Sequence, residues 1–288
     1  LGPALGRQRQ RLAGQPFQGA MRAKMDQRID LPKIIRAGRH IARPKRYLRN
    51  YGEEVEPDEL VAEVERQAAR GDGWVKLVGD WIDRDIGDLT PLWPPDVAEA
   101  AIVRAHELGC RVTAHVFGEQ AASELVAAGI DGIEHGTGID DATIVLMAEH
   151  QVALVPTMIQ IDNFEMYAQS GEDRYPAYAR HMRALYASRL ERFAKALDAG
   201  VPIYAGTDAG GFLPHGLVGQ EIAALGQFSS PEYALGAGSW RARAWLGHPS
   251  RLSEGAHADL VVFDADPRLD LGVLSAPRHV ILRGAVIA

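Results

Sequence analysis

The chain has 288 residues, 47% hydrophobic and 24% charged, so it can bury the core of one large α/β domain or of one domain with a small companion. Its 38 acidic residues outnumber its 31 basic ones and give a net charge of -7, which argues against a nucleic-acid partner and favours a small-molecule substrate. The single cysteine, Cys110, excludes an intrachain disulfide and fits a reducing, cytoplasmic location, and no stretch approaches the roughly 20 apolar residues of a membrane span.

Residues 1–30 differ in composition from the rest of the chain. They are rich in Arg, Gln, Gly and Ala, contain no acidic residue before Asp26, and show neither helical nor strand-like apolar periodicity. This pattern predicts a disordered leader. A basic nucleic-acid-binding arm is the alternative, which the lack of interleaved aromatic residues disfavours. A globular pattern begins at Leu31, with apolar Ile34 and Ile35 followed by a basic run over 36–49.

Between residues 57 and 208, helical patterns alternate with short apolar runs. Helices are expected over 57–71, 96–109, 118–128, 140–150 and 177–199, with a long polar and aromatic loop over 158–175. Strands are expected to end near Lys76, His115, His135, Thr157 and Asp208, the first within the run 74–82. Such alternation is typical of parallel βα units, whose strand ends lie side by side at one edge of the sheet.

The end of the chain changes character. Two further helices are expected over 217–227 and 231–246, and the tail then has β-branched runs with no helix between them, which predicts a small antiparallel appendage. We therefore expect three parts: a leader over 1–30, an α/β barrel over 31–250 and a small β portion over 251–288.

Lys76 stands in an otherwise apolar strand, where a charged ammonium group is costly unless it is paired or chemically changed. One interpretation is a buried salt bridge with a strand-end carboxylate such as Asp208. The other is that burial lowers the lysine pKa, so that the neutral amine reacts with carbon dioxide to give a carbamate that bridges two metal ions.

His115 and His135 each end an apolar run, and both are followed within three residues by a glycine. Two imidazoles at neighbouring strand ends can share a metal, and the glycines would leave room for a ligand; two core histidines are the alternative. Asp208, in a glycine-rich turn, is either a helix N-cap or a carboxylate that contacts a metal and accepts a proton from water. With Lys76, these residues predict a hydrolytic site at the strand ends.

Five motifs resemble the amidohydrolase superfamily, and most closely its prolidase-like and imidazolonepropionase-like branch: WVKLV, VTAHVFG, DGIEHGT, VPIYAGTDAGG and EGAHADLVVFDADP. The resemblance covers residues 31–288 and implies a (β/α)8 TIM-type barrel with a small β-sandwich built from the ends of the chain. It implies that Lys76 is the carboxylated lysine between two metal ions and that Asp208 is the catalytic aspartate of strand eight. His115 and His135 would be the metal ligands after strands five and six. His215, in the loop beyond, would contact substrate or be an ordinary solvated histidine.

By the same resemblance, the reaction is hydrolysis of a carbon–nitrogen bond in a small-molecule amide, such as an N-acyl amino acid, a dipeptide or a cyclic amide. One or two divalent metal ions, zinc in the first place, would serve as cofactor. The family's first strand carries a His-x-His pair, and none of the ten histidines here has another histidine two positions later. The residues before Lys76 are also too few for three βα units.

These departures lead to several expectations. We expect a barrel incomplete at its N-terminus, weak metal binding, low activity, and a leader that arises from a truncated or misread gene start. Two other interpretations stay open. One is an inactive remnant whose open sheet edges favour association into a homo-oligomer or aggregation. The other is a mononuclear deaminase of the same superfamily, in which Lys76 would have no role.

Overall fold

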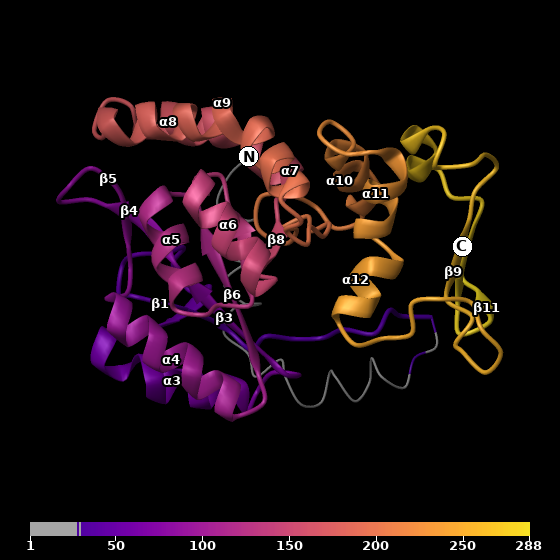
Figure 1. The fold of residues 1–288 in the computed structure, drawn as a ribbon, viewed down its shortest axis with the longest axis horizontal. Helices are drawn as coiled ribbons and strands as arrows, with labels where there is room; N and C mark the ends of the chain where they lie inside the picture. The colour runs from indigo at the N-terminus through magenta and orange to yellow at the C-terminus, as the bar shows by residue number, and fades with distance from the viewer. Residues whose placement is uncertain (1–27, 29) are drawn as a thin grey trace, which may run out of the picture.

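A computed structural model describes residue 28 and residues 30–288, so the predicted leader lies outside the described residues except for Arg28 and Asp30. The centre of the fold is a six-stranded parallel sheet with the strand order β2-β1-β3-β6-β7-β8 (Figure 1). Its strands are β1 (His40–Ala42), β2 (Gly52–Glu54), β3 (Trp74–Val78), β6 (Arg111–Val116), β7 (Gly132–His135) and β8 (Ala153–Val155). Every residue of β3 is buried, as expected for a parallel strand that is covered on both faces.

Helices connect these strands and lie around the sheet (Figure 1). They are α3 (Leu60–Ala68), which follows the 3-10 turn η1 (Pro57–Glu59), α4 (Pro95–Glu107), α5 (Glu119–Ala127), α6 (Asp141–His150) and α9 (Pro176–Asp198). In α4, a proline and Asp96 occupy the first turn and Arg104 the last, as the helix dipole favours. The predicted alternation of strands and helices is confirmed.

The strand registers bring polar residues to one end of the sheet. His115 of β6 pairs with Val78 of β3 on one side and with Glu134 of β7 on the other. Beyond β8, a single parallel bridge between Leu154 and Ile203 extends the sheet to the segment 201–208, which was predicted as a full strand. The predicted α/β architecture is confirmed, with β1 and β2 as strands that were not predicted, and within residues 30–288 the sheet does not close into a complete barrel.

The run 74–82, which was predicted to begin as a buried strand ending near Lys76, contains two strands. The chain breaks at Gly79, and β4 (Asp80–Asp83) pairs antiparallel with β5 (Asp88–Pro91) to form a hairpin beyond the strand ends (Figure 1). A Cβ on Gly79 would lie 2.7 Å from Leu125 and 2.9 Å from the carbonyl oxygen of His115. The chain therefore passes β6 too closely for any larger residue to continue the strand.

The predicted loop 158–175 contains two helices, α7 (Met158–Ile161) and α8 (Phe164–Gly171). Their buried apolar residues are three or four positions apart: Met158, Ile161, Phe164 and Ala168. This is helical spacing, but the polar residues between them hide it in the sequence.

The C-terminal part begins with α10 (Val218–Leu225), α11 (Pro231–Ala237) and α12 (Trp240–Trp245). The tail forms an antiparallel sheet of β9 (Leu260–Val262), β10 (His279–Leu282) and β11 (Ala285–Val286), with the 3-10 turn η2 (Leu271–Ser275) between the first two strands. The predicted antiparallel appendage is confirmed.

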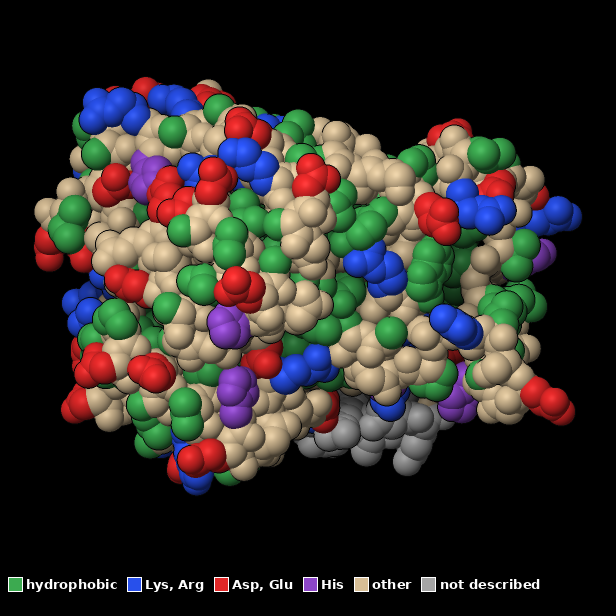
Figure 2. Space-filling model, viewed as in Figure 1, with side chains coloured by type: hydrophobic (Ala, Val, Ile, Leu, Met, Phe, Trp, Pro, Cys, Tyr) green, Lys and Arg blue, Asp and Glu red, His purple; other side chains and the backbone are tan. Residues whose placement is uncertain are grey.

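Figure 2 shows acidic, basic and hydrophobic side chains interspersed over both the helices around the sheet and the C-terminal part. Val261 and Val286 are among the exposed apolar residues of the C-terminal sheet. In the part of the chain that is described, no helix is both long and apolar enough to cross a membrane.

Candidate active site

Lys76 is a buried residue of β3, and its ammonium group is paired with the carboxylate of Glu134. The side chain of Lys76 is 8% exposed, and Thr113 donates a hydrogen bond of 3.0 Å to the other oxygen of Glu134. Burial alone would raise the pKa of Glu134, but the charge of Lys76 holds it at about 2. The salt bridge considered for Lys76 is thus present, with Glu134 rather than Asp208 as its partner. Lys76 and Glu134 lie on opposite sides of β6, where Lys76 pairs with Thr113 and Glu134 pairs with His115, two residues further along the same face of that strand.

The two predicted histidines lie together. The ring centroids of His115 and His135 are 4.7 Å apart, and both side chains are almost completely buried. The Nδ1 of His135 is 2.6 Å from the hydroxyl of Thr157, whereas the Nε2 of His115 is buried without a hydrogen-bond partner among the described residues. Burial, aided by the charge of Lys76, lowers the pKa of His135 to about 3. Burial likewise lowers the pKa of His115 well below its usual range, so both rings are neutral, which is the form that binds metals.

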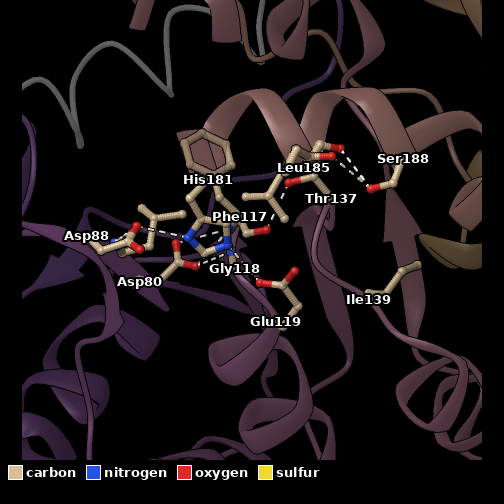
Figure 3. A network of polar contacts seen from close by, with 12 residues as sticks. Asp80, Asp88, Phe117, Gly118, Glu119, Thr137, Ile139, His181, Leu185 and Ser188 are labelled. Carbon is tan, nitrogen blue, oxygen red and sulfur yellow. Dashed lines mark hydrogen bonds and ion pairs between the residues drawn. The ribbon is translucent and has the colours of Figure 1, made fainter. Parts of the chain in front are cut away.

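A buried carboxylate, Asp80 of β4, holds the end of the His115 strand. It accepts hydrogen bonds from the backbone N–H groups of Phe117 and Gly118, and its Oδ1 is 3.7 Å from the Nε2 of His115. Burial raises the pKa of Asp80 to about 7, although the two backbone bonds oppose this rise. Figure 3 shows the same turn continuing into Glu119, which meets His181 of α9. The strand end that carries His115 is therefore fixed by polar contacts on both sides.

Asp208 follows the segment 201–205 with a left-handed backbone, at a φ of 49°. Asp208 is exposed as a residue, but the protein around its carboxyl group desolvates it and raises its pKa to about 6; the charge of Lys76 lowers this pKa and that of Glu134 raises it. His215 is exposed on the following loop, and its ring folds over Gly210, where an added Cβ would lie 3.5 Å from it. The structure thus brings Lys76 together with the two histidines, and His215 lies on the exposed loop after Asp208.

Several residues near the site were not predicted. His40 begins β1, and burial followed by the charge of Lys76 lowers its pKa to about 4. The ring of Tyr47 is 5.8 Å from that of His115 and 4.9 Å from that of Trp81. His40 and Tyr47 lie in the basic run over 36–49, where a strand of three residues is too short to show a period. Glu134 carried a signal, since it is a charged residue inside an apolar strand, like Lys76.

In the described chain, no group of three or more His, Cys, Asp or Glu side chains is placed to hold a metal ion. The donor chemistry fits nevertheless, because His115 offers an unpartnered buried Nε2 beside a second neutral imidazole. A third ligand would come from Lys76 as a carbamate or from Asp208.

The chain as a whole is similar to several known proteins. The sequence profile of the amidohydrolase family matches residues 89–287. An uncharacterized protein of Mycobacterium tuberculosis is 57% identical over 262 residues, which make up 90% of this chain and 70% of that protein. The ochratoxinase of Aspergillus niger is 27% identical over 229 residues, which make up 77% of this chain and 47% of the fungal protein.

Solved structures show the same fold. A candidate prolidase from Bifidobacterium longum has a TM-score of 0.79 at 25% identity, over 93% of this chain and 69% of that one. A Xaa-Pro dipeptidase with bound methionine has a TM-score of 0.70 at 24% identity, over 82% of this chain and 59% of its own, so this chain spans less than two thirds of the dipeptidase. The family profile covers most of the chain, and the resemblance drawn from its motifs is confirmed: the chain belongs to the amidohydrolase family.

Proposed function

We propose that this chain is a metal-dependent hydrolase of carbon–nitrogen bonds in small amides, such as N-acyl amino acids, dipeptides or cyclic amides. The observation that carries the proposal is the pair of buried, neutral imidazoles beside Lys76, with the Nε2 of His115 free to bind a ligand. Family membership supports it, and so do relatives that are named as a dipeptidase and an ochratoxinase.

In this proposal His115, His135, Lys76 and Asp208 hold the metal, which is zinc or a similar divalent ion. Such an ion, when bound, lowers the pKa of water toward ~7 and polarises a carbonyl group. Asp208, with a pKa raised by burial to about 6, is mostly ionised at neutral pH. Its carboxylate can therefore accept a proton from water and return it to the leaving nitrogen.

Lys76 would take part as a carbamate. Its nitrogen must first lose a proton, after which it attacks the carbon of carbon dioxide, forming one N–C bond and releasing a second proton. The side chain of Lys76 is paired with Glu134, so this step requires that pair to open. His215, on the exposed loop after Asp208, would contact the substrate.

The test is to purify the protein with zinc and bicarbonate, and to measure metal content and hydrolysis of a panel of N-acyl amino acids, dipeptides and cyclic amides. We expect bound zinc and hydrolysis, with Asp208→Asn slowing turnover by roughly 10²–10⁴-fold. Asp198→Asn, a change of the same type at the exposed end of α9, should leave the rate unchanged. Absence of both zinc and hydrolysis in the unaltered protein would contradict the proposal.

Lys76→Ala separates the proposal from a deaminase of the same family. A site that depends on the Lys76 carbamate should lose its metal in this variant, whereas a mononuclear deaminase should keep it. Release of ammonia from an aminated ring compound, with metal retained in Lys76→Ala, would favour the deaminase.

A further inference from the structure

Thr157 makes an unusual contact at the end of β8. Its hydroxyl lies 2.6 Å from the Nδ1 of His135, and both side chains are 2% exposed. The backbone of Thr157 is left-handed, with a φ of 49°, which β-branched residues rarely adopt. Strain of this kind persists only where the surroundings enforce it, and it is concentrated at functional sites.

Glu221 of α10 holds the backbone directly after Thr157. Its carboxylate accepts hydrogen bonds from the backbone N–H groups of Met158, at 2.8 Å, and Ile159, at 3.0 Å. The side chain of Glu221 is fully buried, so the protein places a carboxylate in its interior to hold the first turn of α7. Because α7 begins directly after Thr157, Glu221 fixes the hydroxyl that faces His135.

The contact bears on which nitrogen of His135 is free. A neutral imidazole carries one proton, so if Nδ1–H donates to the threonine hydroxyl, Nε2 keeps its lone pair. Histidines that bind metals commonly donate their second nitrogen to a fixed acceptor in this way, which sets the ring orientation as well as the tautomer. No other hydrogen-bond partner of the His135 ring exists among the described residues.

We propose that Thr157, braced by Glu221, is a positioning residue that orients His135 and presents its Nε2 to the metal. This inference rests on the proposed metal-dependent function. Neither residue touches the substrate, and the role of each is exerted through His135.

The decisive variants are Thr157→Val and Thr157→Ser. Valine keeps the shape of threonine but removes the hydroxyl, so we expect zinc affinity to fall by roughly 10–100-fold. Serine keeps the hydroxyl and should retain most of the affinity. Thr143→Val is the matched control, because Thr143 is equally buried but lies on α6. Glu221→Gln should weaken binding less than Thr157→Val, because one of the two backbone bonds is kept.

A second measurement needs no metal. Nitrogen-15 NMR of the metal-free protein reports the tautomer of His135, identified by its loss in His135→Asn. We expect one dominant tautomer, protonated at Nδ1, in the unaltered protein and in Thr157→Ser, and a mixture in Thr157→Val. The same ratio in all three would overturn the inference. If the unaltered protein binds no zinc, the proposed function fails, whereas the tautomer still decides the role of Thr157.

Discussion

The imidazole of His181 joins α9 to two other elements (Figure 3). Its Nδ1 lies 2.9 Å from a carboxylate oxygen of Asp88 in β5, and its Nε2 lies 2.9 Å from one of Glu119 in α5. Only the protonated ring has two N–H groups, so only this form can donate to both carboxylates. The hydrogen bond to Glu119 has the largest effect on the pKa of His181. Together with the hydrogen bond to Asp88, it outweighs burial and raises this pKa to about 9.

This shift predicts a dependence of stability on pH. Because the folded-state pKa lies above the ordinary value of 6.5, the stabilisation is complete below about pH 6.5 and is lost as the pH rises through about 9. In urea unfolding at pH 6, His181→Gln should lower the free energy of unfolding by about 1–3 kcal/mol, a range that allows for partial solvent screening. The difference from the unaltered protein should shrink by pH 10.

The control for this prediction is His150→Gln, at the exposed end of α6. It should leave the free energy of unfolding unchanged at both pH values. A loss of stability in His181→Gln that is the same at pH 6 and pH 10 would show that His181 acts by packing and not by its charge.

Two glycines illustrate what a sequence reveals about single residues. Gly118 and Gly138 were expected to leave space for a ligand near the histidines. A Cβ on Gly138 would lie 2.4 Å from the carbonyl carbon of Gly118, so the two glycines allow the turns after β6 and β7 to touch. The sequence correctly placed small residues beside His115 and His135, but it contains no information on which backbone fills the space.

Among the elements, the β4–β5 hairpin is linked across its two strands by one arginine outside it, Arg46. The guanidinium of Arg46 donates to Asp83 at 2.9 Å, to the carbonyl of Trp81 at 3.1 Å, and to the carbonyl and hydroxyl of Thr90 at 3.2 Å and 2.7 Å. It thereby links both strands of the hairpin, and the ring of Trp81 lies 5.2 Å from that of His115. The position of one wall of the candidate site therefore rests on Arg46.

Arg46→Lys should loosen this hairpin without unfolding the sheet. Lysine keeps the charge but cannot reach all four acceptors, because its donors all sit on one atom. We expect amide hydrogens of residues 81–90 to exchange about tenfold faster, which corresponds to the loss of about 1.4 kcal/mol. Arg84→Lys, near the hairpin tip, is the control and should leave the exchange unchanged. Unaltered exchange in Arg46→Lys would mean that the hairpin is held by other contacts.

The elements differ in how well the sequence reveals them. α4 was predicted because its buried positions recur with helical spacing over 13 residues, and β6 because a short apolar run leads into His115. β1 and β2 have three residues each, and their pairing depends on contacts with residues far along the chain. Lys76 could be singled out because it is a charged residue in an apolar strand. Its partner depends on contacts between distant parts of the chain, so Glu134 could not be chosen over Asp208.

At the scale of the whole molecule, an aromatic stack joins the start of the sheet to the C-terminal helices. The guanidinium carbon of Arg111 lies 4.1 Å from the ring centroid of Trp74 and 5.2 Å from that of Trp245. The Nη1 of Arg111 also donates a hydrogen bond of 2.8 Å to the carbonyl of Trp245. Tyr204 stacks on Trp245, with ring centroids 4.5 Å apart. The stack thus connects β3 and β6 with α12, at the opposite end of the strands from the candidate site.

Arg111→Met should therefore weaken the link between these two parts. Methionine keeps most of the apolar contact with Trp74 and Trp245 but loses the cation–π attraction and the hydrogen bond, so the free energy of unfolding should fall by about 1–3 kcal/mol. Arg180→Met, on the exposed face of α9, should have little effect in the same urea titration. Since the stack is remote from the histidines, zinc affinity should be unchanged. If Arg111→Met and Arg180→Met were equally stable, packing of the rings alone would hold α12 against the sheet.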